Sequence, residues 1–347
     1  MPHDNLARRA RHHALLTGRR HGPSLAAARQ LAPETPLVAT ASPAQALLEG
    51  RVFDKLRWPS TSTIFPFGIA WVDATRPDTS TIALEGDRMV AEVVTKLLPS
   101  QRRGSQDGSG LAGVRVDRID EHVHLRTVDG SARLRLTGFD PALWQHHTAA
   151  QRELILAERG RWYTAPDTLE PGERAHHRRT AHGRRDWDAV AWMTSALLRR
   201  VGLFTTVGLP LWTTAWSSGI GGQVRYCIEM MYGPGTDPRH DQFVERLTDP
   251  VHGLPMDVER THCARHRMGR YCTVDLITSD GRPGALNLRF REQTTDFMAS
   301  FAVGSPREYQ EIQRRWGNAG SSQAFPPVDC STDQQTSPTG TGKGQAP

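Results

Sequence analysis

Apolar and polar positions along the chain change their spacing in the same order twice. Each half reads as a helix, two strands, a helix, three strands and a closing helix. The first half predicts helix 43–57, strands 64–72 and 80–85, helix 87–98, strands 113–119, 121–128 and 131–137, and helix 142–160. The second predicts helix 186–201, strands 209–216 and 223–231, helix 239–247, strands 256–262, 271–278 and 284–291, and helix 305–316. The predicted fold class is α+β, a tandem duplication of an αββαβββα unit with antiparallel sheets.

Individual residues support the repeat. Trp71 and Trp216 each end the first strand of their half, and an Asp-Gly turn follows at Asp129 and Asp280. After each turn leucines alternate with polar residues, in "ARLRLTGF" and "ALNLRFRE", as in a half-buried strand. We therefore expect Trp71 to overlie Trp216. The alternative is two unrelated α+β stretches.

The rest of the chain flanks these two halves. Its beginning predicts a small basic helical hairpin, in which Asp4 and Ser24 cap the helices and His21-Gly22-Pro23 forms the turn. The predicted domains are the hairpin at 1–31, a linker at 32–42, lobe 1 at 43–162, a His/Arg-rich linker at 163–185, lobe 2 at 186–316 and a disordered tail at 317–347.

Composition permits an anionic partner and excludes several classes. The 347 residues carry a formal net charge of +6 with a pI near 9.5, which is compatible with nucleic acid. No apolar run approaches the roughly 18 residues of a membrane span and no signal peptide is evident, so we expect a cytoplasmic protein without membrane contact. Four cysteines are too few for a disulfide framework and are expected to be thiols. No cofactor is expected.

His122 and His124 are the first candidates for metal chemistry. Residues i and i+2 share one face of a strand, and rolling-circle replication endonucleases present two metal ligands in this way. Such a nickase also needs a nucleophilic tyrosine on a helix beside a basic residue, and neither Tyr163 nor Tyr309 is followed by a lysine. The second half carries no matching histidine pair. We therefore favour exposed hairpin residues over a metal site.

Cys263, His266 and Cys272 are the second metal candidates, within "THCARHRMGRYC". Together with His262 they offer two thiolates and up to two imidazoles to a tetrahedral zinc ion. The spacing departs from the paired cysteines of a zinc ribbon, so two half-buried thiols on adjacent strands are the favoured interpretation. Zinc remains an alternative.

The predicted hairpin is the better of two basic runs as a phosphate-binding surface, since a short helix can show one basic and one apolar side. Its pattern "LARRARHHALLTGRRHGPSLAAARQL" resembles a short helical module that opens many uncharacterised proteins of actinobacterial plasmids and integrative elements. The resemblance covers residues 4–31 and implies no activity. The candidate nucleic-acid-binding residues are Arg8, Arg9, Arg11, Arg19 and Arg20.

These observations favour a non-enzymatic, nucleic-acid-associated accessory protein, with a mobile element as the context that the resemblance implies. One alternative is a metal-dependent enzyme, nickase-like at His122 and His124 or zinc-containing at the Cys263 to Cys272 loop. The other is a protein-interaction scaffold formed by the paired lobes.

Overall fold

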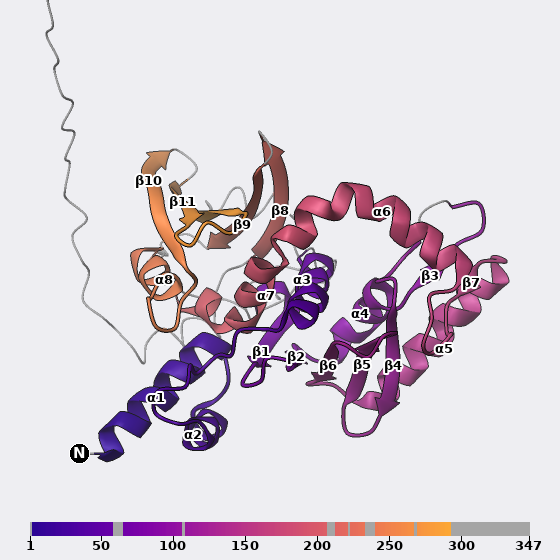
Figure 1. The fold of residues 1–347 in the computed structure, drawn as a ribbon, viewed down its shortest axis with the longest axis horizontal. Helices are drawn as coiled ribbons and strands as arrows, with labels where there is room; N and C mark the ends of the chain where they lie inside the picture. Colours follow the sequence, from indigo (N-terminus) through magenta and orange to yellow (C-terminus); the bar gives the residue numbers. More distant parts are fainter. Residues whose placement is uncertain are drawn as a thin grey trace, which may run out of the picture.

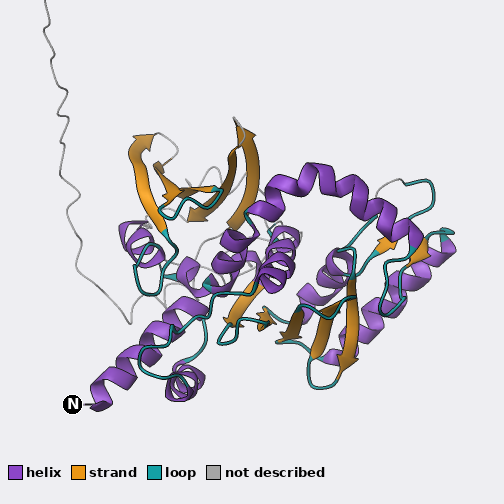
Figure 2. Cartoon of the chain, viewed as in Figure 1, coloured by secondary structure: helices purple, strands orange, loops and turns teal. Residues whose placement is uncertain are grey.

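Two five-stranded sheets lie on either side of a central pair of helices in the computed structural model (Figures 1 and 2). The structure describes residues 2–57, 65–105, 108–206, 212–220, 223–232, 240–266 and 269–292. The predicted helix 305–316 and tail 317–347 lie outside these residues. Within them, the protein is an α+β fold built from a duplicated unit.

The elements follow the predicted order in both halves. Lobe 1 contains α3 (Pro43–Leu56), β1 (Ile69–Asp73), β2 (Thr79–Leu84), α4 (Val90–Leu97), β4 (Val114–Ile119), β5 (Val123–Thr127), β6 (Arg133–Thr137) and α5 (Pro141–Ala157). Lobe 2 contains α7 (Ala191–Arg199), β8 (Trp212–Ile220), β9 (Gln223–Tyr232), α8 (His240–Leu247), β10 (Met256–His266), β11 (Gly269–Thr278) and β12 (Ala285–Glu292). A short pair within lobe 1, β3 (Ser100–Gln101) and β7 (Arg161–Trp162), forms a separate two-stranded sheet.

The sheet topology is the same in both lobes. The strand orders are β1-β2-β6-β5-β4 and, read in the matching direction, β8-β9-β12-β11-β10. Each sheet has one parallel pair, β2 with β6 and β9 with β12, so the sheets are mixed and not purely antiparallel. A register shift falls between Val116 and Arg118 in β4 and between Val258 and Arg260 in β10, at the same point of the ladder. The duplication is thus visible residue by residue.

The ladder corrects the predicted match of the two tryptophans. Trp216 lies opposite Cys227, and the equivalent pair in lobe 1 is Asp73 with Thr81. Trp71 lies two residues earlier, next to a register shift in β1. Both tryptophans mark a strand end, but only strand pairing fixes register, so they do not overlie each other.

Helices α3 and α7 join the two lobes through a buried ion pair. Glu49 accepts hydrogen bonds from Arg199 at 2.7 Å and from Ser195 at 2.6 Å, and both charged side chains are at most 1% exposed. Gly50 lets the helices approach closely, because a Cβ at this position would lie 2.6 Å from the Thr194 hydroxyl. The junction is therefore close-packed.

One hydrophobic core runs through both lobes. Phe53 of α3 contacts Phe67, which contacts Phe204 and, through it, Phe243 of α8, with ring centroids 4.8, 5.5 and 5.3 Å apart. Buried residues of the two sheets belong to the same cluster. The lobes are two repeats that share a core.

The segment 163–185, predicted as a linker, instead contains most of helix α6 (Pro171–Ala189). Figure 1 shows α6 arching from the far end of lobe 1 back to α7. Its first turn is anchored by Glu173, which forms a buried bidentate ion pair with Arg115 of β4 at 2.7 and 2.8 Å. The segment has no apolar stripe, and buried polar contacts hold its N-terminal end.

The N-terminal hairpin is packed against the body. It consists of α1 (Pro2–Thr17) and α2 (His21–Gln30), and the turn occupies Gly18 to Arg20, earlier than predicted. Arg20 holds the N-cap position of α2, and Ser24 is a buried partner of His13 at 3.1 Å. Gly202 of the 3-10 turn η3 (Val201–Thr205) approaches so closely that a Cβ there would lie 2.2 Å from the Gly18 nitrogen.

Candidate nucleic-acid interface

The five predicted arginines of the hairpin divide into two groups. Arg8, Arg11 and Arg20 are exposed. Arg9 donates to the Ala32 and Thr35 carbonyl oxygens at 2.8 and 3.2 Å, so it holds the hairpin to the following loop. Arg19 is likewise used inside the fold. Three of the five guanidinium groups face solvent.

Arg19 connects the hairpin to the outer face of the first sheet, the face turned away from α3. Its guanidinium donates to Asp73 at 2.7 Å and lies 5.0 Å from the ring centroid of Trp71. Both partners belong to β1. The exposed Arg20 follows directly in the chain, so the turn of the hairpin lies at the β1 edge of this sheet.

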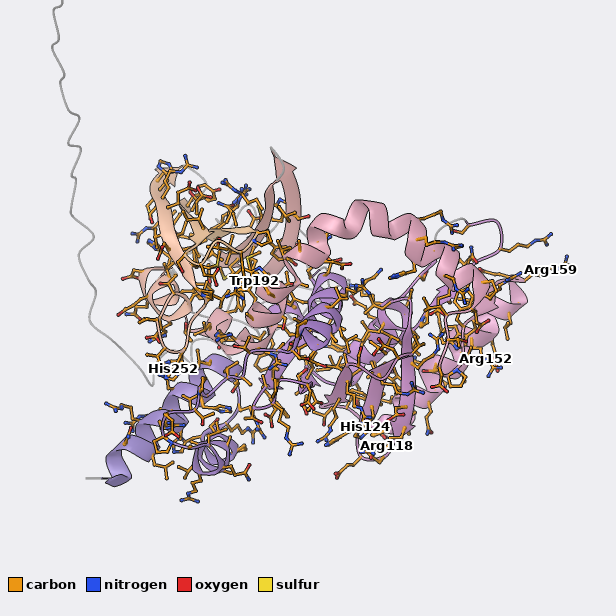
Figure 3. The ribbon with its side chains drawn as sticks, in the orientation of Figure 1. Arg118, His124, Arg152, Arg159, Trp192 and His252 are labelled. Atoms are coloured by element: carbon orange, nitrogen blue, oxygen red, sulfur yellow. The ribbon has the colours of Figure 1, made fainter. Side chains whose placement is uncertain are left out.

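A basic surface, which we call the arginine face, continues across the same side of the sheet. Arg133 and Arg135 of β6 are exposed and alternate with the buried Leu134 and Leu136. Arg133 lies opposite Arg126 of β5, and Arg135 lies opposite His124, whose next neighbour is Arg118 of β4. Arg118 and His124 lie close together at this side of lobe 1 in Figure 3. The arginine face comprises Arg118, Arg126, Arg133 and Arg135.

Carboxylates neutralise only part of this surface. Arg126 pairs with Asp117 and Asp167 at 3.2 and 2.8 Å, and Arg118 pairs with Asp120 at 3.0 Å. Within the described part of the chain, Arg133 and Arg135 form no ion pair. Guanidinium groups keep their charge at every physiological pH, so these two present uncompensated positive charge.

On the corresponding face of lobe 2, two arginines share a carboxylate. Asp275 occupies the position equivalent to His124, since both follow the register shift of the neighbouring strand. Its carboxylate accepts from Arg260 at 2.7 Å and from Asn287 at 2.7 Å, and Arg225 lies 3.5 Å away. The repeats therefore differ in charge where they agree in backbone.

The imidazoles of His122 and His124 do not converge on a common point. Nε2 of His124 lies 3.0 Å from Asp120, whereas Nδ1 of His122 lies 2.7 Å from the Glu121 carbonyl oxygen, and the ring centroids are 6.3 Å apart. His122 precedes β5, so the two residues do not share a strand face as predicted. The amide of His122 lowers the pKa of Asp120 to about 2 through a hydrogen bond. His122 and His124 thus both bond to Asp120 in the turn between β4 and β5.

Cys263 and Cys272, by contrast, lie directly opposite each other on β10 and β11. Cys263 is exposed and Cys272 is buried. Burial, with the neighbouring Cys263 thiol, raises the pKa of Cys272 to about 12, so it is a poor nucleophile at neutral pH. The side chain of His266, the third predicted ligand, lies outside the described residues. His240 of α8, which the sequence analysis missed, joins the two cysteines.

A cleft of about 630 Å³ separates the hairpin from lobe 2. Arg8 and Arg9 line it together with His12 and His252, whose rings meet edge to face with centroids 4.5 Å apart. Burial lowers the pKa of both histidines, and their proximity lowers that of His12 further. The hairpin and the body thus meet at this cleft, and its surroundings favour the neutral forms of His12 and His252.

Comparison with known proteins found no match among protein families, curated proteins or solved structures. None of the helices in the described residues has the length and apolar character needed to span a bilayer.

Sequence reasoning missed Arg133 and Arg135 as binding candidates. The alternation in "ARLRLTGF" does assign them to the polar side of a strand. Their lack of a carboxylate partner could not be read from the pattern, because Asp73 and Asp167 reach other arginines through contacts between residues far apart in the sequence.

Proposed function

We propose that this protein binds nucleic acid through the arginine face, weakly and without sequence preference. The role is that of a non-enzymatic accessory factor, which we place in the cytoplasm and, from the resemblance of residues 4–31, in the context of a mobile element. The described residues supply charge and a rigid surface for such binding, and the proposal assigns no reaction to them.

The observation that carries the proposal is the unpaired state of Arg133 and Arg135 on a solvent-facing sheet. A phosphate group accepts two parallel hydrogen bonds from a guanidinium, and neutralising phosphates releases counterions from the nucleic acid. Two arginines on one side of a strand stand about 7 Å apart, and adjacent strands are about 4.8 Å apart. Arg118 and Arg126 on neighbouring strands extend the same surface.

Rigid support makes the surface suitable for a ligand. The buried amide of Gln45 brackets Arg133, accepting from its backbone N–H at 3.0 Å and donating to its carbonyl oxygen at 2.9 Å. Leu134 and Leu136 fix the other side of β6 in the core. The guanidinium groups thus project from a strand that is already held in place before the ligand binds. This limits the conformational entropy lost on binding.

A titration of the intact protein with fluorescently labelled single-stranded and duplex DNA tests the proposal. With about three to five phosphate contacts, the log–log salt plot should have a slope of roughly −3 to −4, and dissociation constants near physiological salt should fall around 10⁻⁴–10⁻⁶ M. Scrambled sequences should bind equally well. Absence of salt-dependent binding at about 50 mM salt would contradict the proposal and favour the scaffold alternative.

A further inference from the structure

We propose that His240, Cys263 and Cys272 bind one zinc ion at the edge of lobe 2. This inference is independent of the proposed nucleic-acid binding. One nitrogen and two sulfur atoms, one from each residue, all lie within 4.8 Å of one another. Among the described residues, no other three His, Cys, Asp or Glu side chains bring their ligand atoms this close together.

The distances suit a tetrahedral ion. Zinc binds thiolate sulfur at about 2.3 Å and imidazole nitrogen at about 2.0–2.1 Å, so a sulfur and a nitrogen ligand lie about 3.6 Å apart. The Sγ atom of Cys263 lies 3.5 Å from Nε2 of His240. Little movement is therefore needed to place both on one ion.

The donor set selects the class of metal. Two thiols and one imidazole are soft to borderline ligands, which favour zinc over the oxygen-seeking magnesium and calcium ions. Three protein ligands leave the fourth tetrahedral position for water or another group. Cys263 is exposed, so an ion can reach the site from solvent.

Three packed elements hold the ligands. Cys272 belongs to a buried row of β11 with Val274 and Leu276. The His240 ring lies 5.7 Å from the ring of Phe290, which is itself paired with Cys272 in the ladder. Helix α8 is anchored beneath by the buried Phe243. The site is thus preorganised by the core.

Comparison of the repeats shows that the fold does not require these residues. The last pair of the hairpin in lobe 1 is Ile119 with Val123, which corresponds to Thr261 with Val274. Lobe 2 continues the ladder beyond this point, and Cys263 and Cys272 stand on the extension. The duplicated unit therefore forms without the extension or its thiols, which points to a separate role for them.

Cobalt titration of the reduced, chelator-treated full-length protein tests the site. One Co²⁺ per chain should bind and produce a thiolate-to-cobalt charge-transfer band and the visible bands of a tetrahedral ion, and Zn²⁺ should abolish both. Even changes outside the ligand shell cost roughly 10–100-fold in metal affinity, so Cys263→Ser and His240→Ala should each weaken binding by more than about tenfold.

Two matched variants serve as controls. Cys227→Ser removes another buried thiol, on β9, and His262→Ala removes an exposed imidazole beside Cys263; both should retain the cobalt spectrum. Cys272→Ser is not needed for the decision, because Cys263 and His240 are less buried and can be replaced with less effect on the fold. A reduced protein that binds no cobalt, or one in which Cys263→Ser and His240→Ala bind it as tightly as the unmodified protein, would overturn the proposal.

Discussion

Glu49 is the residue on which the junction of the lobes depends most directly. Its carboxylate is fully buried and accepts from Arg199, Ser195 and Gln45, so removing the carboxylate leaves these buried donors without this acceptor. Arg199 also donates to carbonyl oxygens of the loops that precede α3 and follow β1. A buried ion pair adds little net stability, but removal of one partner is costly.

Glu49→Ala is therefore expected to lower the free energy of unfolding by about 3–5 kcal/mol, because the Arg199 charge stays buried and unpaired. Urea denaturation at neutral pH measures the change. Arg260→Ala is the control, since it removes an exposed partner from a carboxylate that keeps Asn287 and Arg225, and its effect should be much smaller. Equal effects of the two variants would show that the junction does not depend on this ion pair.

His13 makes the docking of the hairpin sensitive to pH. Burial lowers the pKa of His13 to about 4, from 6.5 in an exposed chain. The unfolded protein then binds more protons between these values, so stability is complete above about pH 6.5 and declines as the pH falls toward 4. The lowered pKa values of His12 and His252 act in the same direction.

Stability should fall by up to about 3 kcal/mol between pH 7 and pH 4 through His13 alone, from the size of the pKa shift. Thermal unfolding of the protein and of His13→Gln across this range measures the effect. The variant should be less stable at pH 7, because the ring packs at 0% exposure, but should show a shallower pH dependence. An identical pH dependence in both proteins would exclude His13 as a source.

At the scale of elements, hydrophobic periodicity predicted the repeats well and the polar segments badly. Strands β6 and β12 alternate leucines with polar residues, so the faces of these two strands could be predicted. Helix α6 has no such stripe. Its N-terminal end is stabilised by Glu173, which accepts from the Gly113 amide at 2.7 Å, and by His176, which accepts from the Gly108 amide at 3.0 Å. These contacts span 60 and 68 residues of sequence. No local pattern reports them.

Helix α6 should resist proteolysis although it contains many arginines. Backbone hydrogen bonds and the buried Arg115 to Glu173 pair must break before a protease can bind an extended chain. Limited trypsin digestion followed by mass spectrometry should therefore place Arg174 and Arg178 among the late cleavage sites. First cuts after these residues would restore the linker interpretation of 163–185.

The hairpin of α1 and α2 is likewise part of the folded body. Leu16 and Thr17 are fully buried, and Gly18 meets Gly202 at close range. Leu16→Ala should cost about 2–5 kcal/mol, the usual range for a buried leucine, and Ala26→Ser on the exposed side of α2 should cost under about 0.5 kcal/mol. Urea denaturation compares them. A neutral Leu16→Ala would mean that the hairpin is only loosely attached.

At the scale of the whole molecule, two copies of one unit share a core and differ in their chemistry. The strand order and the register shift in β4 and β10 are the same. Lobe 1, however, carries the unpaired Arg133 and Arg135 where lobe 2 carries Ala285 and Asn287, and lobe 2 carries the thiol pair on an extension that lobe 1 lacks. The sequence patterns predicted the order of helices and strands that the two lobes share. The differences depend on which side chains meet across strands, so they appear only in the structure.

The central claim is that unpaired arginines on the first sheet bind phosphate. The direct measurement compares the salt dependence of DNA binding for the intact protein, for the double variant Arg133→Gln and Arg135→Gln, and for the matched double variant Arg225→Gln and Arg260→Gln on lobe 2. Loss of two phosphate contacts should reduce the magnitude of the log–log slope by about 2 in the first double variant, while the second keeps the slope of the intact protein. An unchanged slope in the first, or an equal loss in both, would contradict the claim.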